Sequence, residues 1–170
     1  DYEHDFSTVQ VDLSDDWQHK LQVWVDSNIK SEDLSSEESQ EPPFHITVRY
    51  GLHSKGAAPI EELLGGWGPV SLTLKQIDVF DNNPEYDVLV VQVESPDLVR
   101  MSQVLAELPH TDTHPYYRPH LTLAYLKKGT GSRFAGDVGF FNQRLEIAEA
   151  TFGSSDEAVG PRRISLVQRI

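Results

Sequence analysis

The sequence predicts an α+β fold of two similar halves, whose antiparallel sheets face one another across a central cleft and carry helices on the outside. Three observations lead to this prediction. Short β-type runs alternate with amphipathic helical runs, in the approximate order β-α-β-(α)-β-β-α-β-β-β. A strand-helix-strand block is followed by a comparable block. One strand of each block contains a histidine followed two residues later by a threonine.

The first half opens with a strand and a capped helix. Residues 6–13 alternate between apolar and polar side chains, which is typical of a half-buried strand. Ser14 is a favourable N-cap residue, and two aspartates follow it at the positive end of the predicted helix dipole. Leu21 and the tryptophans at positions 17 and 24 recur at helical spacing, so we expect this helix to bury them in the core.

The first histidine-bearing strand follows a polar loop. Residues 31–43 (SEDLSSEESQEPP) hold acids, serines and two prolines with one apolar residue, which predicts a solvated, flexible acidic loop that could act as a lid. Residues 44–52 (FHITVRYGL) then return to a β-branched, alternating pattern. A short helix is expected over 59–64, with Pro59 in its first turn and glycines after it.

The second half repeats this plan. The turn DNNPE separates two apolar runs and predicts a hairpin. Ser95 and Pro96 open a second helix, whose spacing places Met101 in the core. The strands of this half are expected over residues 70–80, 86–94, 119–126 (PHLTLAYL), 144–152 and 162–169.

The composition indicates one globular domain over residues 1–170. Hydrophobic residues make up 38% of the chain and charged residues 24%, as in ordinary soluble domains. No apolar run is long enough to span a membrane, and the polar start lacks a secretory signal and an initiator methionine. We therefore expect a cytoplasmic protein, trimmed or taken from a larger polypeptide. The absence of cysteine excludes disulfides and thiolate metal sites.

The charge distribution argues against binding to long nucleic acid. The net charge is −13, and residues 1–41 hold 12 acidic and 2 basic residues, against 15 and 12 in the remainder. Proteins that grip long nucleic acid normally present a basic surface to the phosphates. A small phosphorylated ligand held by a few groups in a cleft remains compatible with this charge.

The histidine-bearing strands carry the candidate chemistry. Residues i and i+2 of a strand share a face, so His45 lies beside Thr47 and His120 beside Thr122, while their apolar neighbours point the other way. The remaining histidines lack a threonine at i+2; they are His4, His19, His53, His110 and His114. One such pair would mean little, but two pairs at corresponding positions of two similar halves indicate a shared site.

Two imidazoles suit cleavage of a phosphodiester or cyclic phosphate. The reaction needs a base for the incoming oxygen and an acid for the departing one, and an unperturbed pKa of about 6.5 lets one ring be neutral and the other charged. Threonine hydroxyls can donate to the non-bridging oxygens. This chemistry requires no metal and no cofactor.

Several alternatives stay open at this point. Either histidine alone could be a structural residue, and a metal site would need more ligands than these strands offer. A binding module could use the same pocket for a nucleotide or cyclic nucleotide without turning it over. The domain could also belong to a larger structural protein.

The motifs HITVRY and HLTLAY resemble the paired H-x-T motifs of the two-histidine phosphoesterases, a family that includes 2′-5′ RNA ligase-like proteins and cyclic phosphodiesterases. The resemblance implies two lobes around a groove and metal-independent opening of 2′,3′-cyclic phosphates or handling of 2′-5′ linkages, with ligation as the reverse step. It also implies that His45 and His120 are catalytic and that Thr47 and Thr122 bind the phosphate.

The strand FSTVQVDL and the phrase RYGLH resemble versions of this domain encoded by bacteriophages, which would place the protein in the host cytoplasm and make cyclic oligonucleotides a candidate substrate class. Four further residues are expected to contact the substrate. Arg118 lies two residues before His120, where it could meet a phosphate. Tyr50, Tyr116 and Tyr117 flank the motifs and could stack on a base. Tyr125 is expected to point away, because its spacing from His120 is odd.

Overall fold

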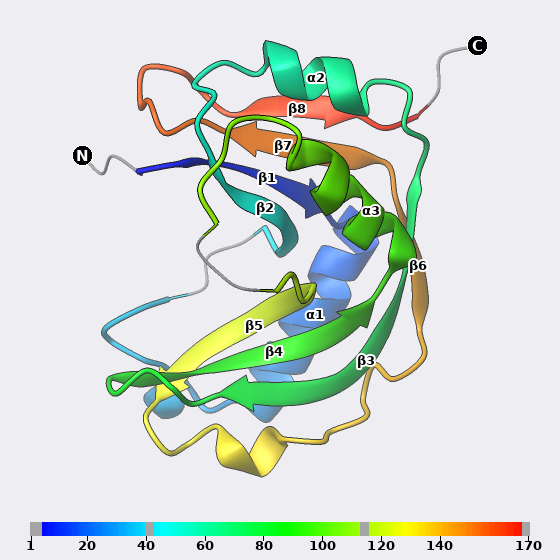
Figure 1. Cartoon of the computed structure of the whole chain (residues 1–170). Coiled ribbons are helices and arrows are strands. Elements are labelled where there is room, and N and C mark those ends of the chain that lie inside the picture. Colours follow the sequence, from blue (N-terminus) through cyan, green and yellow to red (C-terminus); the bar gives the residue numbers. More distant parts are fainter. Residues whose placement is uncertain (1–4, 40–42, 113–115, 168–170) are drawn as a thin grey trace.

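The computed structural model describes residues 5–39, 43–112 and 116–167 and shows a curled antiparallel sheet with three α-helices (Figure 1). Eight strands form the sheet in the order β6-β3-β4-β5-β2-β1-β7-β8. The first four in chain order are β1 (Ser7–Asp12), β2 (His45–Leu52), β3 (Val70–Phe80) and β4 (Tyr86–Glu94). The others are β5 (His120–Lys127), β6 (Arg144–Ile147), β7 (Glu149–Gly153) and β8 (Arg162–Ser165).

Two of the helices begin where the sequence predicts, and the short one begins one residue earlier. They are α1 (Asp15–Asn28), α2 (Ala58–Leu64) and α3 (Pro96–Leu105). The hydroxyl oxygens of Ser14 and Ser95 accept hydrogen bonds from the backbone three residues further on, which satisfies free N–H groups at the starts of α1 and α3. Leu21 and Met101 are fully buried, as their spacing predicts. None of the helices in the described ranges is long and apolar enough to cross a membrane.

The sheet consists of two four-stranded halves that meet at one seam. Strands β5 and β2 are the inner strands of the two halves, and a single residue pair, Ile46 and Leu121, joins them. Figure 1 shows the halves diverging from this point. Both residues of the pair are fully buried. The predicted α+β architecture of two similar halves with outer helices is therefore confirmed.

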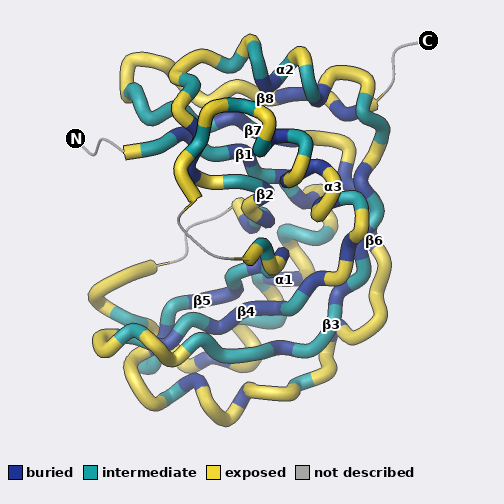
Figure 2. The backbone as a smooth tube through the Cα atoms, viewed as in Figure 1, coloured by how far each residue is buried: buried dark blue, intermediate teal, exposed yellow. Residues whose placement is uncertain are grey.

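The helices bind the two halves together. Helix α1 follows β1 but packs on the other half, where Trp24 contacts Phe134 and Phe140 with ring centroids 5.8 and 5.9 Å apart. Helix α3 follows β4 but contacts β2, where Arg49 donates to the carbonyl of Ser102. Each of these two helices therefore crosses the seam. Figure 2 shows the buried positions running along the strands of both halves as one core.

Residues 144–152 form two strands, so the prediction of one strand was wrong. The alternation of buried and exposed residues breaks at Ala148 and Glu149, which are both exposed. Strand β6 pairs with β3, and β7 pairs with β1 in the other half. The chain thus crosses from one half to the other at this break. The last residues of the predicted strand 162–169 lie outside the described part of the chain.

The acidic loop is attached to β5 over its first part. Residues Ser31–Asp33 form a short 3-10 helix, Leu34 forms a bridge with Leu126, and the N–H of Ser35 donates to the carbonyl of Tyr125 at 2.9 Å. The serines and acids that follow are exposed, as predicted for a solvated loop. Its flexibility stays a prediction, since residues 40–42 lie outside the described ranges.

Candidate active site

The two H-x-T motifs come together at the seam. Strands β2 and β5 are antiparallel with Ile46 opposite Leu121, so extending this register by one residue places His45 opposite Thr122 and Thr47 opposite His120. All four side chains project from the face of the sheet away from the helices, which we call the open face. His45, His120 and Thr122 are half-buried, and Thr47 is exposed. Two histidines and two threonines from distant parts of the sequence therefore share one surface.

Both imidazoles are held in the same way. Nδ1 of His45 lies 3.3 Å from the carbonyl oxygen of Pro43, and Nδ1 of His120 lies 2.9 Å from that of Arg118. A carbonyl can only accept, so Nδ1 carries the hydrogen in each ring and Nε2 is left as the basic nitrogen of the neutral form. No other described residue hydrogen-bonds to either Nε2. Each ring is thus oriented by its Nδ1 contact, and its Nε2 has no hydrogen-bond partner in the described part of the chain.

His110 shows why the free Nε2 matters. Its Nδ1 also lies close to a carbonyl two residues earlier, that of Leu108 at 2.8 Å. However, its Nε2 is 3.3 Å from a carboxylate oxygen of Asp112. The local backbone contact is therefore common to three histidines, and the availability of Nε2 distinguishes the two in the motifs.

A β-bulge follows each motif and changes which side chains share its face. In the first motif Thr47 pairs with Gln10 and Arg49 with Val9, so Val48 has no partner in β1. The second motif pairs with β4 in the same irregular way. Val90 lies opposite Thr122, and the next residue of β4, Leu89, lies opposite Ala124. Leu123 therefore has no partner in β4. Residues beyond a bulge lie on the opposite face from the one that simple alternation predicts.

The bulges place Tyr50 and Tyr125 on the open face, so the expectation that Tyr125 points away was wrong. Tyr50 lies opposite Thr8, and Tyr125 lies opposite Val88. The ring of Tyr125 packs edge-on against Tyr86 at 5.3 Å, and burial, followed by Glu38 and Tyr86, raises its pKa. A tyrosine at the fifth position after the histidine in both motifs was the sequence signal for this placement.

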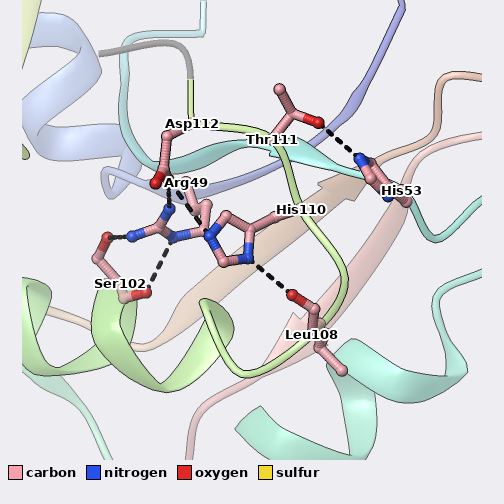
Figure 3. A network of polar contacts seen from close by, with 7 residues as sticks. All are labelled: Arg49, His53, Ser102, Leu108, His110, Thr111 and Asp112. Carbon is pink, nitrogen blue, oxygen red and sulfur yellow. Dashed lines mark hydrogen bonds and ion pairs between the residues drawn. The ribbon is translucent and has the colours of Figure 1, made fainter. Parts of the chain in front are cut away.

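The same bulge turns Arg49 toward the helices, as Figure 3 shows. Its guanidinium donates to the carbonyl and the hydroxyl of Ser102 in α3 at 2.9 and 3.1 Å, and it pairs with Asp112 at 3.3 Å. Arg49 therefore ties β2 to α3 and to the segment before β5. It does not join His45 on the open face.

The two histidines have different neighbours on the outer strands. Asp12 lies opposite His45, and its carboxylate accepts hydrogen bonds from Gln10 at 2.9 Å and Thr151 at 2.5 Å. Gln92 lies opposite His120, whose ring also packs edge-on against Phe80 at 5.1 Å. The open face is therefore polar beside the first motif and aromatic beside the second. Sequence reasoning missed these neighbours, although Gln10 and Asp12 are polar positions of an alternating strand.

Of the other three residues expected to contact the substrate, one packs against the core and two lie on the surface. Tyr117 donates its hydroxyl to the carbonyl oxygen of Thr47 at 2.9 Å and packs against the core, so it supports the first motif; its stacking on a base stays a prediction. Tyr116 is 76% exposed, and the side chain of Arg118 is also exposed. The placement of these two near a substrate stays a prediction.

Two surface hollows lie away from the motifs. One, of about 420 Å³, lies between the end of α2 and β8, and the other, of about 330 Å³, lies between the start of the acidic loop and residues 129–133.

Among the described residues, no group of three or more histidine, aspartate or glutamate side chains lies close enough to hold a metal ion. The described motif residues offer two imidazoles and two hydroxyls, a set suited to proton transfer around a bound oxyanion.

A family model of the 2′-5′ RNA ligase superfamily matches residues 43–135, which contain both motifs. The chain belongs to this superfamily. Membership supports a phosphoesterase-type activity in general terms. Among curated proteins, a sequence search found no match.

Solved structures of low sequence identity share the fold of this superfamily member. TT0787 of Thermus thermophilus has a TM-score of 0.64 and 16% identity, over 97% of this chain and 100% of that one. Usb1 of Kluyveromyces marxianus has a TM-score of 0.59 and 12% identity, over 96% and 99%. LigT of E. coli complexed with phosphate has a TM-score of 0.56 and 16% identity, over 99% and 100%. At these identities the likeness concerns the fold.

Proposed function

We propose that this protein is a metal-independent phosphoesterase that hydrolyses a cyclic phosphate or a 2′-5′ or 3′-5′ phosphodiester of a small nucleotide or oligonucleotide. One observation carries the proposal. His45 and His120 lie on one face, each with Nδ1 held by the carbonyl two residues earlier and with Nε2 facing no described partner. Binding alone would not need two such acid–base groups.

The proposed reaction uses each ring once. One neutral imidazole takes a proton from water through Nε2 while the water oxygen forms a bond to phosphorus. The bond between phosphorus and the ribose oxygen breaks, and the other imidazole, which is protonated, gives its proton to that oxygen. The hydroxyls of Thr47 and Thr122 donate to the non-bridging oxygens, where negative charge accumulates. The open face then holds a phosphate monoester and the two rings with their protonation states exchanged.

The surroundings of the motifs favour a small substrate with an aromatic base. The first 41 residues are strongly acidic, and the start of the acidic loop is bound to β5, so a long polyanion would meet like charge there. Tyr125, Tyr86 and Phe80 form an aromatic side beside His120, which suits a nucleobase. LigT structures complexed with phosphate and with 3′-AMP lend support from the same fold.

A turnover screen in EDTA tests the proposal. The panel contains 2′,3′-cyclic mononucleotides, 2′-5′-linked dinucleotides, and cyclic di- and trinucleotides, with a double His45→Ala/His120→Ala protein as the blank. Turnover by the wild-type protein alone would support the phosphoesterase and name its substrate class. Binding without turnover would instead favour a nucleotide-binding module.

The threonines provide a further prediction. Thr47→Val and Thr122→Val preserve side-chain shape and remove a donor that we place on the phosphate, so each is expected to lower kcat/KM by about 10- to 100-fold, given about 1.5–3 kcal/mol for a hydrogen bond to a charged group. Thr130→Val serves as the control, since the hydroxyl of Thr130 bonds only within a turn among the described residues. Wild-type kcat/KM in both motif variants would remove the threonines from the mechanism.

A further inference from the structure

The described parts of the connection between α3 and β5 contact β2 in two places. The backbone N–H of Thr111 donates to the carbonyl of Gly51 at 2.8 Å, and His110 forms a bridge with Leu52. At the other end of the same strand, Ile46 pairs with Leu121. His110 and Thr111 therefore lie along one end of β2, and Leu121 lies beside its other end.

One pair of residues is a weak constraint on the spacing of two motifs. Neighbouring strands elsewhere in this sheet share between four and seven paired positions, whereas β2 and β5 share one. The separation of His45 and Thr47 from His120 and Thr122 must therefore depend on contacts outside the strand ladder.

Tyr117, just before β5, supplies such a contact. Its hydroxyl donates to the carbonyl oxygen of Thr47 at 2.9 Å, and its ring packs against the core. It precedes His120 by three residues, so the contact joins the backbone of one motif to the approach of the other. Burial raises the pKa of Tyr117 well above its ordinary value, with Arg49 acting in the opposite direction, so the hydroxyl remains a donor at neutral pH.

A second anchor fixes the start of the same segment. Arg49 holds Asp112 at 3.3 Å while it also binds Ser102 of α3, and Nε2 of His110 contacts the same carboxylate (Figure 3). The described parts of this segment are thus held to β2 at Asp112 and at Tyr117. The contact at Tyr117 is the one adjacent to the catalytic motifs.

We propose that Tyr117 is a positioning residue, whose hydroxyl sets the placement of the His120 motif relative to the His45 motif by holding the Thr47 carbonyl. Its catalytic consequence rests on the proposed phosphoesterase function. Reactions that need two proton-transfer groups on opposite sides of one phosphorus are sensitive to small displacements, since a misplacement of about 1 Å can cost about 100-fold in rate.

Tyr117→Phe tests this inference, with Thr130→Val as the control, because the hydroxyl of Thr130 also donates to a backbone carbonyl, that of Lys127, in the turn after β5. Tyr117→Phe keeps the packed ring and removes only the donor, so we expect kcat to fall about tenfold with little change in KM on the substrate found by the screen. The deficit should stay constant between about pH 6 and 9, because the lost hydroxyl is protonated throughout this range. Thr130→Val, which loses a hydroxyl that bonds within this turn, should keep the wild-type kcat.

A spectroscopic measurement separates this inference from the proposed function. Imidazole resonances assigned to His45 and His120 are recorded by NMR, with and without inorganic phosphate. Tyr117→Phe should shift both sets, whereas Thr130→Val should shift neither. If the wild-type protein turns nothing over, the phosphoesterase proposal fails and these shifts alone decide the positioning role. Unchanged histidine resonances, or an unchanged kcat in an active enzyme, would overturn it even if the variant unfolds at a lower temperature.

Discussion

Replacing either motif histidine with alanine is expected to remove most turnover and leave the fold intact. General acid–base catalysis by one positioned side chain typically contributes about 10²- to 10⁴-fold, so His45→Ala and His120→Ala should each lower kcat by a factor in this range. The rings are half-buried on the open face, and the apolar core lies on the other face of their strands. Thermal unfolding should therefore change little.

Alanine variants of two other histidines show whether the loss of kcat is specific to the motif histidines. His19, which is exposed on α1, gives a control in which loss of an imidazole should not alter kcat. His110→Ala removes a ring that has the same Nδ1 contact but whose Nε2 contacts Asp112, so any fall in kcat should be much smaller than in either motif variant. Wild-type-like kcat in His45→Ala or in His120→Ala would refute the two-histidine mechanism. A double variant no slower than each single variant is expected if the rings act as one unit.

Gly51→Ala is expected to destabilise the protein by about 3 kcal/mol or more. Gly51 has a φ of +101°, a conformation that costs a side-chain-bearing residue about 1–3 kcal/mol. A Cβ atom there would lie 2.1 Å from the carbonyl oxygen of Thr111, so the backbone of the following segment must move. This movement would break the hydrogen bond between Thr111 and Gly51, which adds about 1 kcal/mol.

Gly136→Ala separates the cost of the positive φ from the cost of the close contact with Thr111. Gly136 also has a positive φ, +85°, but a Cβ atom there would meet nothing within 4 Å. This variant should therefore lose only the conformational part, about 1–2 kcal/mol. Urea unfolding of both variants measures the difference. Equal losses in the two proteins would show that the close approach of Thr111 to β2 contributes nothing to stability.

Local signals in the sequence determined most of the secondary structure and the motif pairs. Alternation predicted β1 and β2, the turn DNNPE predicted the β3–β4 hairpin, and Ser14 and Ser95 predicted two helix starts. Spacing of two residues placed each histidine on the same face as its threonine. These properties depend on residues near one another in the chain, and the pleat of a strand applies wherever that strand lies.

The tertiary structure alone decided the register between strands. The bulges after Thr47 and Thr122 turn Tyr50 and Tyr125 to the open face, and the first bulge sends Arg49 to α3. A bulge arises from pairing with a particular neighbour, so the alternation of β5 by itself predicted the wrong side for Tyr125.

The neighbours of the two histidines and the contact that spaces them also depend on tertiary structure. Asp12 meets His45 through strand pairing, and Tyr117 reaches Thr47 across 70 positions of the sequence. The chain by itself specified which groups are available for catalysis. Their mutual placement came from long-range packing, because no local pattern records which strand edge a segment will meet after folding.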